Sequence, residues 1–332
     1  MSDTSRAPRD NPLDFLKGVL VIVMVLYHAM NVYADAGPGA YSYIRFVSGS
    51  FVFVSGYFLP AFYGERFSQA PWGTSKRLLQ RGFKLVLLFT LLNGLILLSG
   101  VGNPHKQTTI AGDYWAHAAA IYGIGAPGAA AFQILLPIAY VLLLAPLFLG
   151  LSKYRHGLIA GGFASALAWS LADIESINLG MGVVGIIGLF LGMAASSLER
   201  LFGIPGKTAL LAGIAATMAL MEFFDRNALT YAVGVTLMVM LLYALARRLA
   251  LQDRASAVAI LLGKYSLLGY IGQIVLLQVS ARLLGGPRWP LGVEILAIVA
   301  ATTVLLALLC YALQYLRGRS TLVDKGYRLV FS

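Results

Sequence analysis

The first apolar segment carries four polar side chains of kinds that transfer protons or hold ligands. Residues 13–33 read LDFLKGVLVIVMVLYHAMNVY, and the four are Asp14, Lys17, His28 and Asn31. The series 14, 17, 21, 24, 28, 31 advances in steps of three and four residues, so all four belong to one face of a helix. Polar groups in so apolar a segment are costly to bury and indicate function.

His28 suits proton transfer because imidazole titrates near neutrality. At about 1.5 Å per residue it lies about 22 Å along the helix axis from Leu13, in the outer third of a hydrocarbon core of about 30 Å. Asn31, one turn further on, is placed to orient the ring or a bound ligand. The alternative is that His28 only forms a hydrogen bond between helices, and the shared face with Asp14 and Lys17 favours the functional interpretation.

The second apolar segment combines small, hydroxyl and aromatic residues in the sequence RFVSGSFVFVSGYFLP at positions 45–60. Ser55 and Tyr57 are candidates for the wall of a site near the middle of the membrane. No base stands beside Ser55 in the sequence, so a serine nucleophile is weakly supported. Close packing of helices through glycine and serine explains the same pattern and is favoured.

Composition indicates what must position these side chains. The chain has 332 residues, of which 59% are hydrophobic and 12% are charged, whereas soluble domains are about 45–50% apolar and about 25% charged. A soluble globule, a disordered chain and, with Cys310 as the one cysteine, a disulfide scaffold are excluded. We expect an all-α polytopic membrane protein that forms a single domain over residues 1–332. The ten segments expected to cross the membrane are 13–34, 43–64, 80–100, 131–150, 156–173, 178–198, 207–224, 229–248, 258–283 and 292–316.

The basic residues predict the orientation. With a cytoplasmic N-terminus and ten spans, 20 of the 25 Lys and Arg lie inside and 5 outside, while the 14 acids divide 7 and 7. The inside therefore carries 20 − 7 = +13 and the outside 5 − 7 = −2, which accounts for the net charge of +11. Both termini are expected in the cytoplasm, and nucleic acid is not needed to explain the basic excess.

A basic cluster follows the second expected span. Lys76, Arg77, Arg81 and Lys84 lie within nine residues, and Arg77, Arg81 and Lys84 share one helical face. Arg side chains suit phosphate oxygens, so a phosphate clamp is one interpretation; orientation in the membrane and anionic lipid headgroups are others. No P-loop, HExxH or CxxC motif occurs, so we expect neither a nucleoside triphosphatase nor a metal site.

Two motifs resemble a known family. The segments LDFLKGVLVIVMVLYHAMN and FVFVSGYFL resemble the acyltransferase 3 family of bacterial membrane proteins, and YHAMN is closer to its OpgC-like glucan succinyltransferase branch. FQILLPIAYVLLLAPLFL and LGKYSLLGY are similar to the middle and late helices of that group. The resemblance implies about ten spans in the bacterial cytoplasmic membrane. It also implies transfer of an acetyl or succinyl group from cytoplasmic acyl-CoA to a hydroxyl of a glycan or related acceptor.

The resemblance also implies roles for particular residues. His28 matches the essential histidine of the family, and Lys17 stands where the family often has Arg. The family's basic pair falls on Arg77 and Arg81, spaced RLLQR rather than RxxR, and Gln273 stands where many members have His.

From these positions we expect a mechanism without a permanently bound cofactor, in which acyl-CoA is the co-substrate. His28 acts as general base, Asn31 positions the reacting groups, and Lys17, Arg77, Arg81 and Lys84 bind acyl-CoA. Asp14, Ser55, Tyr57, Tyr270 and Gln273 are candidates for the site wall, with Tyr57 or Tyr270 as donors to the oxyanion. A transporter or flippase for a lipid-linked sugar, and an assembly partner without a site, are the alternatives. The sequence carries no signal for an oligomeric state.

Overall fold

The computed structural model describes residues 11–34, 44, 46–99, 118–125, 131–151, 176–193, 213, 216, 228–249, 253–284 and 292–331. The elements of these segments are all helices, which confirms the expected class for this part of the chain. Five helices are long and apolar enough to cross a membrane: Asn11–Tyr33, Phe46–Gln69, Pro71–Ile96, Ser266–Leu283 and Val293–Arg319. Three shorter apolar helices cover Leu135–Gly150, Ile177–Met193 and Tyr231–Arg247.

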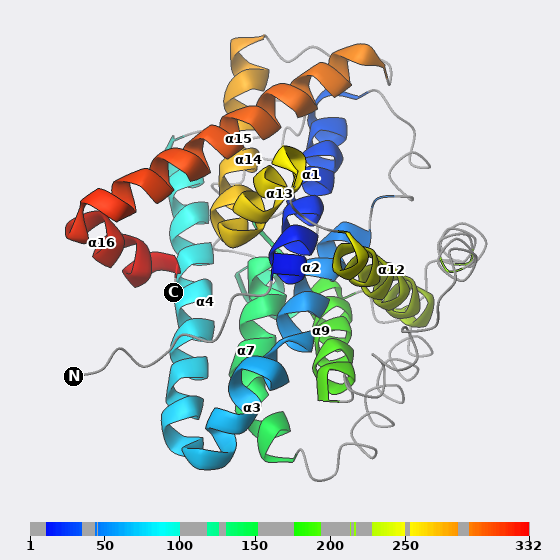
Figure 1. The fold of residues 1–332 in the computed structure, drawn as a ribbon, viewed down its shortest axis with the longest axis vertical. Coiled ribbons are helices and arrows are strands. Elements are labelled where there is room, and N and C mark those ends of the chain that lie inside the picture. The colour runs from blue at the N-terminus through cyan, green and yellow to red at the C-terminus, as the bar shows by residue number, and fades with distance from the viewer. Residues whose placement is uncertain are drawn as a thin grey trace.

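One group of helices is built around α1 (Asn11–Tyr33). This helix packs against α13 (Arg254–Lys264), α14 (Ser266–Leu283) and α15 (Val293–Arg319). Figure 1 shows α15 crossing over α14 and α1, with α16 (Thr321–Phe331) folding back from its end. This group positions the polar face of α1.

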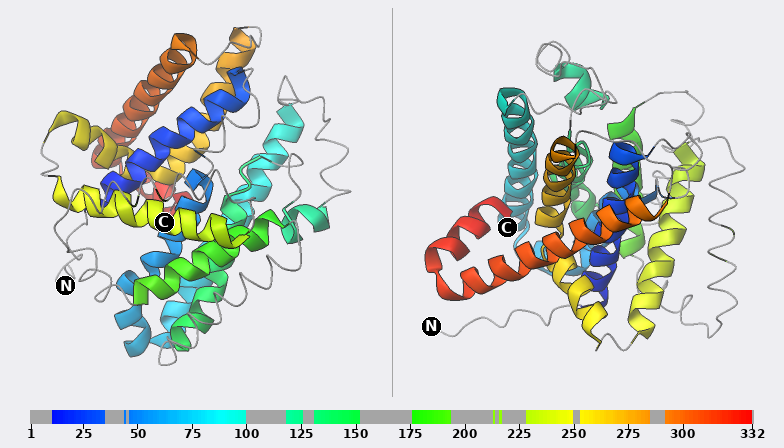
Figure 2. Two further views of the ribbon diagram at one scale, coloured as in Figure 1. Left: turned by 90° about the vertical axis from the view of Figure 1, so that its right-hand side faces the viewer. Right: turned by 90° about the horizontal axis from the view of Figure 1, so that it is seen from above.

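The second group contains α2 (Phe46–Tyr57), α3 (Leu59–Gln69), α4 (Pro71–Ser99), α6 (Ala118–Gly123), α7 (Leu135–Gly150), α9 (Ile177–Met193) and α12 (Ala228–Arg248). Here α2 packs on α9 and α12, while α4 lies along α7. The long α4 is visible in Figure 1, and Figure 2 shows the helices of both groups from two further sides. α1 contacts α2 and α12, and so joins the groups.

Glycines bring two helix pairs into backbone contact. A Cβ on Gly56 of α2 would lie 1.9 Å from the carbonyl oxygen of Gly185 on α9, and one on Gly192 would lie 2.0 Å from that of Tyr57. A Cβ on Gly263 of α13 would lie 1.6 Å from the carbonyl oxygen of Asp14 on α1. Only glycine permits these approaches, and small residues at helix contacts are typical of membrane proteins. This supports the packing interpretation of the second segment.

Several boundaries differ from the expected ones. The span expected over 258–283 is divided at Tyr265 into α13 and α14, and the span expected over 43–64 is divided at Phe58, just before Pro60. The helix expected from residue 131 begins at Leu135, because the backbone at Phe132 is left-handed with φ 58°. The separate helix α16 was not expected. The spans expected at 156–173 and, apart from residues 213 and 216, at 207–224 lie outside the described residues.

Candidate active site

Asp14 and Lys17 form an ion pair on the first turns of α1. Lys17 Nζ lies 2.8 Å from Asp14 Oδ1, and the Lys17 side chain is 24% exposed while that of Asp14 is 4% exposed. Asp14 is covered by α13, since its carbonyl oxygen lies directly against Gly263. The expected polar face therefore exists at this end of α1, with the ammonium group at the edge of the bundle.

His28 is half-buried on the same helix, and its Nε2 is completely covered. No described residue offers this nitrogen a hydrogen bond. The ring of Tyr27 meets the imidazole edge-on, with the centroids 5.3 Å apart. Buried polar atoms normally form hydrogen bonds, and a catalytic role is one reason why a buried polar atom has no hydrogen-bond partner. The contacts of Nε2 thus give no support to a purely structural hydrogen bond between helices.

α14 runs beside α1 in the same direction and brings Gln273 to the depth of His28. A Cβ on Gly269 would lie 3.1 Å from the Val21 side chain. Further along, the Tyr33 hydroxyl lies 2.5 Å from Ser280 Oγ and donates to the Leu277 carbonyl oxygen at 3.3 Å. Gln273 stands midway between Gly269 and Leu277, so its level on α1 is that of Tyr27 and His28.

Gln273 shares the unusual state of His28. The side chain is fully buried, and among the described residues neither Nε2 nor Oε1 has a hydrogen-bond partner. On α15, Thr303 Oγ1 is also buried without a partner in the described structure. Along α15, Thr303 lies between Ile295, which belongs to the same buried cluster as Tyr33, and Leu306, which meets Gly272. In the described structure α1, α14 and α15, which pack on one another, therefore each hold a buried polar atom without a hydrogen-bond partner.

Tyr270 connects this region to the start of α7. Its ring meets that of Phe132 edge-on, with centroids 6.0 Å apart. Phe132 is buried and has a positive φ, which is rare for a bulky residue and costs about 1–3 kcal/mol of strain. Strained backbone of this kind concentrates at functional sites.

Asn93 of α4 holds this strained turn, and the sequence reasoning missed it. Its Oδ1 accepts from the Ala131 N–H at 2.8 Å, and its Nδ2 donates to the Ala131 and Phe89 carbonyl oxygens at 3.0 and 2.9 Å. A signal was available, because Asn93 is a lone amide in the apolar run TLLNGLILL. On α9, Asn178 Nδ2 likewise donates to the carbonyl oxygens of Ile121 and Tyr122 at 2.9 and 3.1 Å.

Replacing Asn93 by alanine is expected to destabilise the protein by about 1–3 kcal/mol, because both backbone groups of Ala131 lose a buried partner. Thermal unfolding in detergent measures the change. Gln80→Ala on an exposed turn of the same helix is the matched control, with an expected effect within about 0.5 kcal/mol. Equal unfolding midpoints for the two variants would show that the hydrogen bonds between Asn93 and Ala131 contribute nothing to stability.

The side chains of the other candidates from the first two segments, Asn31, Ser55 and Tyr57, contact residues other than His28. Asn31 is exposed, and its Nδ2 donates to the Tyr27 carbonyl oxygen at 2.9 Å. Ser55 Oγ donates to the Phe51 carbonyl oxygen at 2.7 Å, within its own helix. Tyr57 is buried against the rings of Phe53, Phe58 and Tyr243.

The basic cluster lies on the first half of α4. Arg77 and Arg81 are exposed, and Lys84 is half-buried. Arg81 donates to the Tyr63 hydroxyl on α3, and its guanidinium lies 5.7 Å from the centre of that ring. α4 packs on α7 and α3, whereas Lys17 lies on α1, whose neighbours are α13, α14, α15, α12 and α2. The described contacts therefore do not unite Lys17 with the α4 cluster.

Comparison with known proteins identifies the family. The sequence model of the acyltransferase 3 family, described as an acyltransferase domain, matches residues 10–313. No curated protein and no solved structure matches the chain. The matched residues include α1 with His28, Asn93 with its hydrogen bonds to Ala131, and the face of α14 that bears Gln273. Because it covers most of the 332 residues, this helical chain belongs to the acyltransferase 3 family.

Proposed function

We propose that the protein transfers an acetyl or succinyl group from cytoplasmic acyl-CoA to a hydroxyl of a glycan or related acceptor at the outer face of the bacterial cytoplasmic membrane. The observation that carries the proposal is the buried Nε2 of His28, which has no hydrogen-bond partner among the described residues and lies inside an acyltransferase domain. A neutral imidazole nitrogen without a protein partner can accept a proton from an alcohol.

The proposed reaction begins when His28 accepts the proton of the acceptor hydroxyl as its oxygen attacks the thioester carbonyl. The tetrahedral oxyanion then collapses, the carbon–sulfur bond breaks, and the departing thiolate of CoA takes the proton from His28. Buried donors stabilise such an oxyanion strongly. Gln273 Nε2 and the Tyr270 hydroxyl, on one face of α14 at the depth of His28, are the donors proposed here.

Access from both sides of the membrane requires a defined topology. Five of the described helices are long and apolar enough to cross a membrane. The three shorter apolar helices and two further sequence segments are proposed to complete ten spans. Their contacts support an alternating path: Asn93 near the end of α4 meets Ala131 before α7, and Tyr231 at the start of α12 meets Gly49 at the start of α2. The basic excess assigns both termini to the cytoplasm.

The phosphates of CoA are proposed to bind Arg77, Arg81 and Lys84 of α4, with Lys17 at the edge of α1. Arg77 and Arg81 are exposed and follow each other at one-turn spacing. Arg81 is oriented by Tyr63, which leaves further guanidinium donors for a phosphate. Lys17 carries Asp14 as its counter-ion at 2.8 Å, so its role is electrostatic attraction at the mouth of the bundle.

Arg77→Ala is expected to raise KM for acyl-CoA about tenfold with little change in kcat, because a charge-assisted hydrogen bond contributes about 1.5–3 kcal/mol. Lys76→Ala is the matched control: it removes the same charge from the adjacent exposed position, on a different face of the helix. Steady-state kinetics with labelled acyl-CoA measure both. The same rise for both variants would mean that local charge alone, and not the Arg77 face, holds the substrate.

A transfer assay tests the function itself. Membranes that contain the protein are incubated with acyl-CoA radiolabelled in the acyl group, and label is followed into the cell-surface glycan fraction. Transfer above that of membranes without the protein is expected. A transporter or flippase would instead move a sugar-like substrate across proteoliposomes without acyl-CoA and leave the glycan unlabelled.

A further inference from the structure

The C-terminal helix α16 starts where a span ends. α15 is apolar and long enough to cross the membrane up to Arg319, and α16 begins at Thr321. Only Ser320 separates the two helices. The first turn of α16 must therefore lie at the membrane surface where α15 emerges. The basic residues Arg317, Arg319, Lys325 and Arg328 gather at this end, which the charge bias assigns to the cytoplasm.

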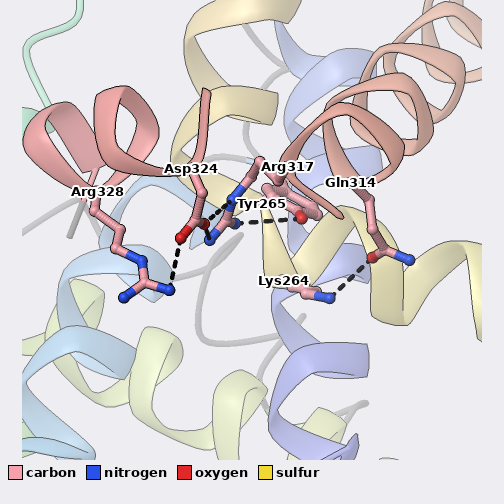
Figure 3. A network of polar contacts seen from close by, with 6 residues as sticks. All are labelled: Lys264, Tyr265, Gln314, Arg317, Asp324 and Arg328. Carbon is pink, nitrogen blue, oxygen red and sulfur yellow. Dashed lines mark hydrogen bonds and ion pairs between the residues drawn. The ribbon is translucent and has the colours of Figure 1, made fainter. Parts of the chain in front are cut away.

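A polar network fixes the rotation of α16 against the bundle. Arg317 of α15 donates to Asp324 Oδ1 through Nη2 at 2.6 Å and Nε at 2.9 Å, and Arg328 Nη2 pairs with Asp324 Oδ2 at 2.6 Å. Figure 3 shows Asp324 between these two guanidinium groups. The Arg317 guanidinium also lies 4.0 Å from the centre of the Tyr327 ring. Asp324 and Tyr327 therefore face the protein.

The hydrogen bond from Arg317 lowers the pKa of Asp324 below its ordinary value, and the pair with Arg328 acts in the same direction. A carboxyl group with a lowered pKa stays ionised throughout the neutral range. Its contribution to the docking of α16 is therefore present at physiological pH and is lost only on strong acidification.

The rotation leaves an apolar strip outside. Leu322 and Leu329 are 79% and 72% exposed, and Val330 is 43% exposed. Their spacing of seven and eight residues places them on one side of the helix. Lys325 and Arg328 are exposed beside this strip, three residues apart. An apolar strip bordered by basic side chains complements an anionic lipid surface, in which acyl chains lie beneath negatively charged headgroups.

We propose that α16 is an interfacial helix that lies on the anionic lipid of the membrane surface at which α15 ends. Leu322, Leu329 and Val330 enter the boundary between headgroups and acyl chains, and Lys325 meets lipid phosphates, while Arg328, which pairs with Asp324, adds positive charge beside it. The contact of Arg317 with Asp324 keeps the strip turned towards the lipid. α16 then forms a basic, lipid-bound edge of the helix bundle beside the C-terminal ends of α13 and α15.

Site-directed spin labelling of the full chain tests this arrangement. Cys310 is fully buried, so the unsubstituted chain serves as the labelling blank. Single cysteines replace Leu322, Leu329 or Lys325, and Ala255, exposed in the first turn of α13, is the control position. Each labelled protein is reconstituted in phosphatidylcholine with or without phosphatidylglycerol. Collision with oxygen, which concentrates in lipid, is then compared with collision with a water-soluble nickel chelate.

In the vesicles with phosphatidylglycerol, the oxygen-to-nickel ratio is expected to be several-fold higher at 322 and 329 than at 325 and 255. Lys325→Glu in the chain labelled at 322 is expected to lower the ratio more than Lys325→Gln, because it repels the anionic surface. Equal water accessibility at all four positions would overturn the proposal. Protection of 322 and 329 from both reagents would also overturn it, since a protein surface would then cover the strip.

Discussion

His28→Ala is expected to lower acyl transfer by about 10²–10⁴-fold, which is the usual contribution of a positioned general base. The reduction should appear in kcat, because His28 acts on the proton of the acceptor and does not hold the phosphates of CoA. The same radiolabelled acyl-CoA assay measures it. His28→Gln, which retains a polar side chain of similar length without the basic nitrogen, should be nearly as impaired.

Two controls separate catalysis from folding. Because His28 Nε2 has no partner among the described residues, its removal deprives no described group of a hydrogen bond. The unfolding midpoint of His28→Gln should therefore stay close to that of the unsubstituted protein. Thr236→Val on α12 removes a hydroxyl that donates to the Ala232 carbonyl oxygen at 2.7 Å, and should leave transfer nearly unchanged. Full transfer by His28→Ala would exclude His28 as the base.

The polar face of α1 was predictable at one end and not at the other. Steps of three and four residues average about 3.4, slightly less than the helical period of 3.6. Between Asp14 and Asn31 the difference accumulates to a rotation of about 100° around the helix. Asp14 is therefore buried under α13, His28 keeps an intermediate position, and Asn31 is exposed. The assignment of all four residues to one face, which used their spacing alone, did not take this rotation into account.

The placement of Gln273 at the level of His28 depends on tertiary packing that no local pattern contains. The residues from 258 to 283 read as one apolar run, yet the helix is interrupted at Tyr265. Before the break Gly263 lies against the α1 backbone, and after it Gly269 lies against Val21. The positive φ at Phe132 was equally hidden, since no glycine or asparagine marks it. Asn93, which holds that turn, was detectable by the rule that a polar residue within a span needs a reason.

The contact between α1 and α13 makes Gly263→Ala the most disruptive glycine-to-alanine substitution expected among the described residues. The added Cβ would lie 1.6 Å from the Asp14 carbonyl oxygen and 2.9 Å from the Gly18 nitrogen. Both are backbone atoms, so no side-chain rotation relieves the clash and α13 must move away from α1. We expect a loss of about 3 kcal/mol or more, above the usual range for overpacking, together with reduced transfer because Asp14 and Lys17 shift.

Cys310 reports this change directly. Its thiol is buried in the cluster of Val21, Leu262 and Tyr265, beside the α1–α13 contact, and the chain has no second cysteine. A thiol-reactive fluorophore therefore detects thermal opening of this region. Gly182→Ala is the matched control, because nothing lies within 4 Å of a Cβ at that position of α9, and the better helix propensity of alanine should leave the midpoint equal or slightly higher. A Gly263→Ala midpoint as high as that of Gly182→Ala would mean that α13 can withdraw from α1 without cost, and that the close backbone contact does not hold the entrance of the site in place.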